Sequence, residues 1–173
     1  MPRVGDGAVI SDCKKYRYVL TRRVGTNSRT VVFIMLNPSW ADAVKTDKTL
    51  DRCIGYARQW GYGRLTLLNL FAFRAQDKSQ LKKVPDPIGP ENETHFVNVL
   101  GAIVRNVDDD PLIVCAWGND GILKNRDLIV FRWLKKRDFH PRALGLTTKG
   151  HPRHPSRARK DVELVPFSPP PRN

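Results

Sequence analysis

Apolar runs without polar alternation recur along the chain and predict the strands of a buried sheet. The clearest run covers residues 31–36, where all six positions are apolar, a pattern typical of a strand covered on both faces. Comparable runs at 65–70 and 112–117 predict two further buried strands. Shorter strands are expected at 16–20 and 143–146.

Amphipathic periodicity between these strands predicts three helices. Thr46 or Asp47 caps the first, whose apolar face consists of Leu50, Cys53, Ile54, Ala57 and Trp60. Pro90 opens the second, whose apolar face consists of Phe96, Val99, Leu100, Ile103 and Val107. The third follows Gly118-Asn119 and ends near Lys136.

This alternation of strands and helices predicts one α/β domain over residues 1–164. We expect a three-layer α/β/α sandwich with a mainly parallel central sheet. A basic loop is expected at 147–160, and the Pro-rich segment 165–173 reads as an extended or disordered tail.

The charge of the chain points to a polyanionic partner. Thirty Lys and Arg residues against 17 Asp and Glu give a net charge of +13, which favours binding to nucleic acid through phosphate contacts. A solvated cationic surface, a ribosome-like role and a membrane-surface role are the alternatives.

Cysteine usage favours a reducing cytoplasm. The three cysteines are widely separated and lack the spacing of a disulfide framework or a metal site. No apolar leader and no run of transmembrane length is recognised. We therefore expect a cytoplasmic protein that does not enter the membrane, with a monomer as the expected state.

Polar side chains follow the strands where each of them ends. Asn37 and Ser39 follow the first buried strand, and Asn69 lies in the next. Because α/β proteins place ligands at the carboxyl edge of the sheet, these groups and the basic loop are expected to share one site. The loop 150–157 adds His154 and arginines, so this edge is suited to reading a base and a phosphate together. No paired carboxylates and no glycine-rich phosphate loop occur there, which disfavours kinase and dinucleotide-binding functions.

The chain resembles the uracil-DNA glycosylase superfamily in four segments that occur in the same order. They are Met35-Leu36-Asn37-Pro38-Ser39, the segment from Thr66 to Arg74, Ala116-Trp117-Gly118 and His154-Pro155-Ser156. The chain is also similar, over roughly residues 10 to 160, to a bacterial and phage family of unknown function, domain of unknown function 1643. The hallmarks of that family, Leu-Asn-Pro-Ser, Asn-Leu-Phe-Ala-x-Arg and Gly-x-Pro-x-His-Pro, all occur here.

The resemblance implies a role for three polar residues. Asn37 aligns with the residue that places the attacking water, and Asn69 with the amide that reads the pyrimidine edge. His154 aligns with the histidine that donates to a base oxygen as negative charge develops. The structural alternatives are a turn opener for Asn37, a buried amide that holds a loop for Asn69, and a phosphate contact for His154.

Aromatic and basic residues complete the implied site. Trp40 or Phe71 would stack on a flipped base, although aromatic residues beside strand ends more often belong to the core. The DNA-binding residues are expected to be Ser39, Arg153, Ser156, Arg157, Arg159 and Lys160. A solvated charge run is the alternative for the basic residues.

The sequence departs from the superfamily pattern at three points. Met35-Leu36 replaces the glycine before the first motif, the leucine after His-Pro-Ser is absent, and the water-activating aspartate of the uracil branch is missing. The resemblance implies a DNA base glycosylase that acts on a flipped pyrimidine or modified base, without a metal or an organic cofactor. Two alternatives are an enzyme acting on free modified nucleotides and a DNA-binding module that does not cleave.

Overall fold

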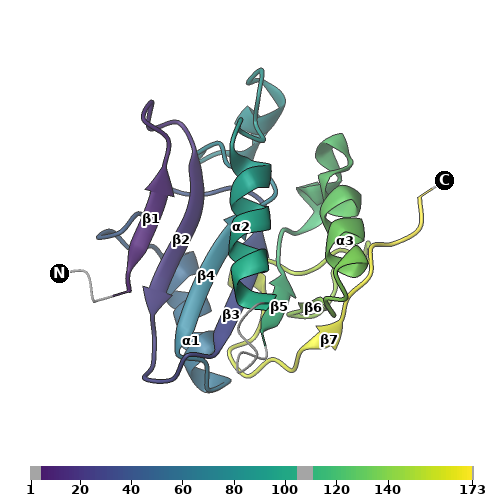
Figure 1. Ribbon diagram of the computed structural model, residues 1–173. Helices are drawn as coiled ribbons and strands as arrows, with labels where there is room; N and C mark the ends of the chain where they lie inside the picture. Colours follow the sequence, from purple (N-terminus) through teal and green to yellow (C-terminus); the bar gives the residue numbers. More distant parts are fainter. Residues whose placement is uncertain (1–4, 105–110, 173) are drawn as a thin grey trace.

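A computed structural model describes residues 5–104 and 111–172 of the chain. A seven-stranded sheet crosses the described part of the molecule (Figure 1). Its spatial order is β1 (Gly7–Ile10), β2 (Arg17–Arg23), β4 (Arg64–Asn69), β3 (Thr30–Met35), β5 (Leu112–Cys115), β6 (Arg142–Ala143) and β7 (Val165–Pro166).

The sheet is mixed, and the expected mainly parallel sheet is confined to its centre. Strands β4, β3, β5 and β6 run parallel to one another. Strands β2 and β1 continue the sheet antiparallel at one edge, and β7 does so at the other. In this register Met35 pairs with Asn69, and Ile34 pairs with Cys115, so the ends of the three central strands lie level.

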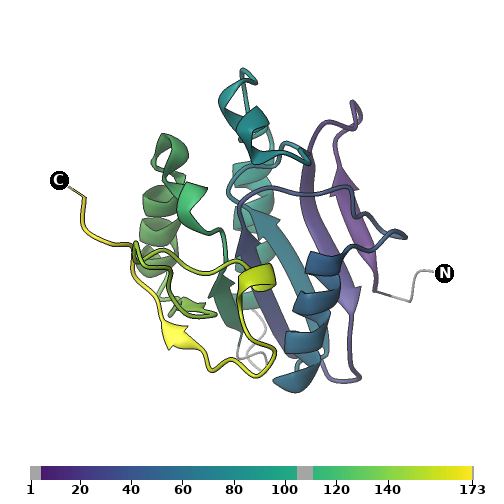
Figure 2. The same ribbon diagram turned by 180° about the vertical axis from the view of Figure 1, so that it is seen from behind.

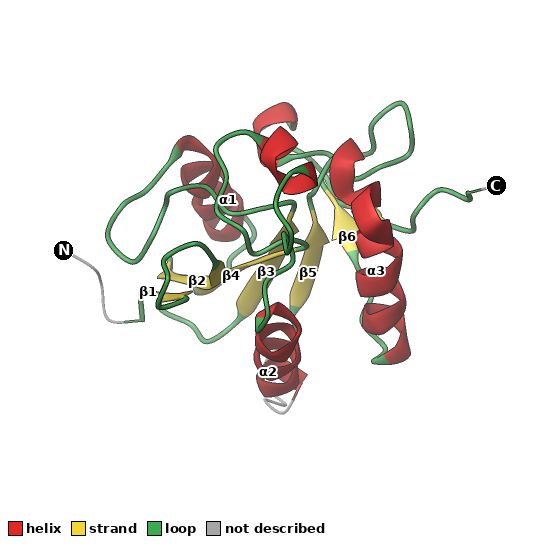
Figure 3. Cartoon of the chain, turned by 90° about the horizontal axis from the view of Figure 1, so that it is seen from above, coloured by secondary structure: helices red, strands yellow, loops and turns green. Residues whose placement is uncertain are grey.

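Helices cover both faces of the sheet. Helix α1 (Lys48–Gln59) lies on one face, and α2 (Asn92–Val104) and α3 (Arg126–Lys136) lie on the other (Figures 1 and 3). All six residues of β3 are buried. Val31, Phe33 and Met35 pack with α1, while Val32 and Ile34 pack on the opposite side. This two-sided burial is the reason for the unbroken apolar run.

The first helix begins where the sequence predicts. Asp47 is its N-cap, because its Oδ1 accepts the Leu50 N–H at 2.8 Å. Leu50, Cys53 and Ala57 of the predicted face are buried. The other two helices begin later than expected, since Pro90 precedes α2 by a turn and the 3₁₀ segment η2 (Asn119–Asn125) precedes α3. Val107 lies outside the described residues.

Several predicted boundaries are corrected at the edges of the sheet. Strand β2 begins at Arg17 rather than Tyr16 and continues to Arg23, and β1 was not expected at all. Strand β6 ends at Ala143 instead of running to Leu146. Strands β1 and β6 have only four and two residues, so they carry little of the periodicity from which strands are predicted.

The segment after residue 164 contributes to the sheet and core. Val165 and Pro166 pair with β6, and the Phe167 N–H donates to the Pro141 carbonyl at 3.0 Å. Phe167 is 5% exposed and packs edge-on against Trp117, with ring centroids 5.4 Å apart. The expectation of a disordered tail therefore does not describe residues 165–167, because one aromatic side chain anchors them.

The carboxyl ends of the parallel strands point to the upper edge of the sheet in Figure 1, where the 3₁₀ segment η1 (Lys78–Lys82) lies. A further 3₁₀ segment is η3 (Pro155–Arg157). Figure 2 shows η3 beside α1. The Tyr56 hydroxyl donates to the Arg159 carbonyl at 2.6 Å, which ties the end of the basic loop to that helix.

Candidate functional site

Two adjoining cavities lie where the parallel strands end. The outer cleft has a volume of about 850 Å³ and is lined by Leu36, Trp117, Gly118 and a set of charged residues. The inner pocket has a volume of about 160 Å³ and lies beneath it, between the sheet and the loop that leads into α1. Asn37, Gln76 and His154 line both cavities and so form the junction between them.

Asn69, the last residue of β4, is the central polar residue of the inner pocket. It is 1% exposed, and neither its Nδ2 nor its Oδ1 has a hydrogen-bond partner in the described part of the chain. A buried amide without partners is destabilising by about 1–3 kcal/mol. Such a group indicates that the pocket receives a ligand or ordered water with both a donor and an acceptor.

Arg17, the first residue of β2, also lines this pocket and was missed by sequence reasoning. It is 3% exposed, its Nη1 donates to the Ala41 carbonyl, and its Nε has no partner among the described residues. Burial lowers the pKa of its guanidinium to about 10, although the Asp47 carboxylate opposes this shift. A charged residue at the start of an apolar run is normally predicted to be exposed at the end of a strand. The sequence therefore gives no sign that Arg17 is buried in a pocket.

Ser39 and Asp47 form one wall of the inner pocket. The Ser39 hydroxyl donates to Asp47 Oδ2, while the other carboxylate oxygen caps α1. Ser39 was expected to contact the DNA backbone; the structure directs its hydroxyl to Asp47 instead. The sequence predicts Asp47 only as a helix cap. Its carboxylate also lines the inner pocket, because the loop before α1 folds over the end of the sheet.

Asn37 is held in one orientation at the junction. Its Nδ2 donates to the Ala75 carbonyl at 2.9 Å and to the Pro38 carbonyl at 3.1 Å. Because both bonds use the amide nitrogen, the Oδ1 lone pairs remain for a water or ligand donor at the junction. The amide is therefore fixed as an acceptor.

His154 is fixed as a donor on the other side of the junction. The Ser156 backbone N–H donates to its Nδ1 at 3.2 Å, and the Ser156 hydroxyl lies 2.8 Å from the same atom. A backbone N–H can only donate, so Nδ1 is unprotonated and the neutral ring carries its hydrogen on Nε2. Burial lowers the His154 pKa, which favours this neutral form, and the Asp47 charge only partly opposes it.

Charged side chains gather around the outer cleft. They are Asp77, Lys78, Asp120, Lys149, Arg153 and Arg157. Lys78 forms an ion pair with Asp120, and the Arg153 Nε donates to the Leu146 carbonyl at 2.9 Å. The remaining charge of the cleft is positive. Lys78 and Lys149 were not singled out from the sequence, because isolated lysines carry no positional signal.

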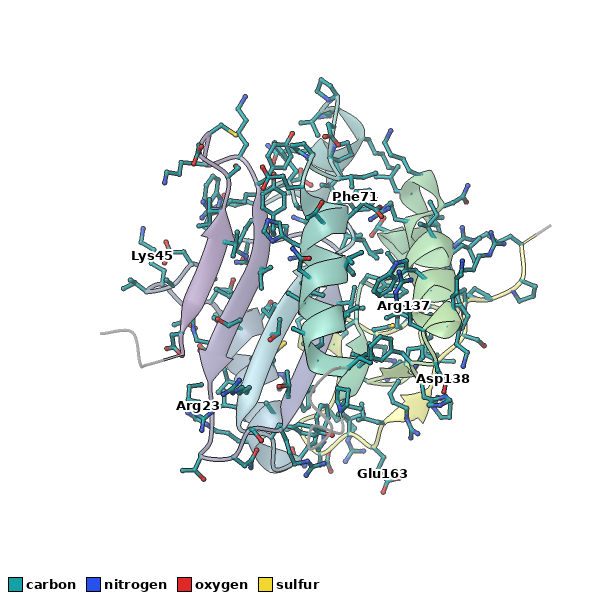
Figure 4. The ribbon with its side chains drawn as sticks, in the orientation of Figure 1. Arg23, Lys45, Phe71, Arg137, Asp138 and Glu163 are labelled. Atoms are coloured by element: carbon teal, nitrogen blue, oxygen red, sulfur yellow. The ribbon has the colours of Figure 1, made fainter. Side chains whose placement is uncertain are left out.

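Four predicted residues lie outside both cavities. Trp40 is 49% exposed and stacks under the Arg74 guanidinium, 4.6 Å from its ring centre. Phe71 is fully buried in the core beside α2 (Figure 4). Arg159 pairs with Asp161 at 3.0 Å, and Lys160 lines a separate surface hollow against α1. Phe71 is thus a core residue, which was the alternative to its predicted role in stacking on a base.

Comparison with models of protein families identifies the family of the chain. The model of the family described as "Protein of unknown function (DUF1643)" matches residues 17–156. The chain belongs to this family. No curated protein and no solved structure matches it.

The DUF1643 match encloses both cavities almost completely. It begins at Arg17 and ends at Ser156, so it includes Asn37, Asn69 and His154. Arg157 of the outer cleft lies just beyond it. Within residues 5–104 and 111–172, no helix is long and apolar enough to cross a membrane.

Proposed function

We propose that the protein is a DNA base-processing enzyme, a monofunctional glycosylase that hydrolyses the bond between a flipped base and its deoxyribose. The observation that carries the proposal is the junction. A fixed acceptor, Asn37, and a fixed donor, His154, lie between a wide basic cleft and a smaller inner pocket. The order of strand-end motifs shared with the uracil-DNA glycosylase superfamily and the helices on both faces of the sheet support it.

In this proposal the inner pocket receives the base. Its volume of about 160 Å³ corresponds to about five water molecules at roughly 30 Å³ each, which suits one pyrimidine ring better than a purine. The two unpartnered atoms of Asn69 match the adjacent N–H and carbonyl of a pyrimidine edge. Met35, Leu50 and Leu67 supply apolar walls for the ring.

The sugar would then lie at the junction, where the reaction takes place. The bond from C1′ to the base nitrogen breaks, and its electron pair leaves with the base. The oxygen of a water held by Asn37 Oδ1 bonds to C1′, its proton passes to solvent, and solvent protonates the departed base. His154 Nε2–H donates to a base oxygen while the negative charge develops. Asn37 cannot deprotonate the water, so slow turnover is expected.

The outer cleft would hold the DNA backbone. Arg153 and Arg157 line it beside Lys78 and Lys149, and the whole chain carries a charge of +13. Phosphate contacts of this kind give salt-dependent affinity and position the strand without reading sequence.

The test uses oligonucleotides that carry uracil, mismatched thymine, hypoxanthine or hydroxymethylated pyrimidines, each single-stranded and in duplex. Abasic sites are detected by alkaline cleavage. We expect product with at least one of these bases, lost in Asn37→Ala and His154→Gln and kept in Arg159→Ala, whose side chain lies outside the cleft. Absence of abasic product from every substrate, together with salt-sensitive DNA binding, would instead support the non-cleaving module.

The second candidate is an enzyme that acts on free modified nucleotides with the same pocket. The size and lining of the inner pocket suit a base from either source. The same bases supplied as nucleosides and nucleotides decide between them, because release of free base from these alone would exclude DNA as the substrate.

A further inference from the structure

Three arginines hold the loop that roofs the inner pocket, and only one of them faces the pocket. Arg17 Nη1 donates to the Ala41 carbonyl, Arg22 Nη2 donates to the Asp42 and Lys45 carbonyls, and Arg74 Nη2 donates to the Trp40 carbonyl at 3.4 Å. Arg22 and Arg74 do not line the inner pocket. Arg17 thus differs from the other two arginines in that its side chain both holds the loop and lines the pocket.

The charges that line the inner pocket are those of Arg17 and Asp47, and Arg22, Arg74 and Asp42 lie farther out around Arg17. Asp47 at the start of α1 and Asp42 in the loop favour the charged form of Arg17, while Arg22 and Arg74 oppose it. The Asp47 oxygens are already engaged by the Leu50 N–H and the Ser39 hydroxyl. The His154 ring at the mouth of the pocket is neutral and presents a further donor.

Donors also outnumber acceptors in the cavity. Arg17 Nε and the Asn69 amide nitrogen are buried and have no partner in the described part of the chain, and His154 adds Nε2–H at the mouth. The amide oxygens of Asn69 and Asn37 are acceptors without partners, and the Gln76 amide at the junction adds one donor group and one acceptor. A ligand that completes these bonds is rich in acceptors, and one that bears negative charge completes them best.

We propose that Arg17 is a catalytic residue that makes the inner pocket a site for the pyrimidine in its anionic form, the form in which the base leaves the sugar. The inference rests on the proposed function. When the bond to C1′ breaks, the electron pair stays on the base, and Arg17 holds the resulting negative charge inside a pocket of low dielectric. This stabilises the departing base directly and complements Asn37, which cannot activate the water by deprotonating it.

Equilibrium binding of free bases tests this without any turnover. The probes are uracil and 6-azauracil, two rings of nearly equal shape, of which 6-azauracil loses its proton more readily. Titrations followed by NMR run from about pH 6 to about pH 8, where an arginine stays charged. We expect the affinity for 6-azauracil to rise by about tenfold or more across this range, the size of a charged hydrogen bond. Uracil stays neutral and reports any change due to His154 alone.

Variants assign the effect to Arg17. Arg17→Met is expected to abolish the rise for 6-azauracil, and Arg17→Lys to keep part of it. Arg22→Met is the matched control, since it releases loop carbonyls in the same way but removes no charge from the pocket. Should Arg17→Met not fold, the comparison of the two bases in the natural protein and in Arg17→Lys still decides.

The outcomes separate this inference from the proposed function. If neither base binds the natural protein, the base pocket itself is wrong. If both bind with equal affinity at every pH, or if Arg22→Met abolishes the rise as fully as Arg17→Met does, the role of Arg17 is wrong and the base pocket stands.

Discussion

The inner pocket and the outer cleft contain similar kinds of polar side chain but place them in opposite environments. In the pocket, Asn69 and Arg17 are 1% and 3% exposed and keep atoms without partners. In the cleft, Lys78 and Asp120 pair with each other while their side chains remain 63% and 41% exposed. Bulk water can replace a partner lost in the exposed cleft, whereas a partner lost in the buried pocket must be replaced by an ordered water or a ligand. The difference predicts that single changes in the pocket alter stability and function strongly, while changes in the cleft alter mainly the affinity for a polyanion.

The largest effect on stability is expected at Asp47. Asp47→Ala removes the N-cap of α1, strands the Ser39 hydroxyl and takes a negative charge away from Arg17. We expect the free energy of unfolding to fall by about 2 kcal/mol, the upper range for a lost cap, measured by urea denaturation. Asp47→Asn is the control that keeps the cap and should lose much less. Equal losses in both variants would show that the charge rather than the cap carries the stability.

A change of opposite sign is expected at Asn69. Asn69→Leu keeps the approximate shape of the side chain and removes two unpartnered polar atoms, so the free energy of unfolding should rise by about 1 kcal/mol. The same variant should no longer bind uracil. Asn92→Leu is the matched control, because the Asn92 Nδ2 donates to the Asn69 carbonyl at 3.0 Å and its loss should destabilise. If Asn69→Leu is instead less stable than the natural protein, the Asn69 amide is hydrogen-bonded in the free protein. Its polar atoms are then not available to a ligand.

The same contrast explains how far the sequence alone could lead. The buried strand 31–36 and the meeting of Asn37, Asn69 and His154 at one edge follow from strand periodicity and parallel order, and both agree with the structure. Arg17 could not be found, because its place beside Asn69 depends on β2 pairing antiparallel with β4. A strand order is a long-range property that local patterns do not contain.

The direction of side chains that follow a strand end also could not be predicted from the sequence. Alternation places Asn69 and Leu70 on opposite faces of the sheet, but Phe71 lies past the last residue of β4 and turns into the core. Trp40 likewise lies in a loop whose course is set by distant arginines. The motifs therefore predicted which polar side chains lie together at the strand ends, but not that Trp40 and Phe71 lie outside both cavities.

A smaller effect, dependent on pH, is expected at the junction. Burial lowers the His154 pKa below its usual value of 6.5, so the unfolded chain takes up the proton at a higher pH than the folded one. The contribution of His154 to stability is therefore fully present above pH 6.5 and is lost as the pH falls through the lower pKa of the folded state. His154→Gln should flatten the dependence of the unfolding free energy on pH as the pH falls below 6.5. His151, whose pKa is also lowered by burial, stays in both proteins and cancels in the comparison.

The smallest effect on stability is expected in the outer cleft, at the Lys78–Asp120 ion pair. A double-mutant cycle with Lys78→Ala and Asp120→Ala should give a coupling energy of about 0.5 kcal/mol or less, because both side chains stay exposed and solvent screens the pair. The two substitutions should nevertheless differ in DNA binding. Lys78→Ala should weaken it and lower the slope against salt by about one, whereas Asp120→Ala should strengthen it. If the two variants change DNA affinity in the same direction, the cleft does not bind DNA through its positive charge. The predicted contrast, in which the cleft sets polyanion affinity and the pocket sets stability and function, is then wrong.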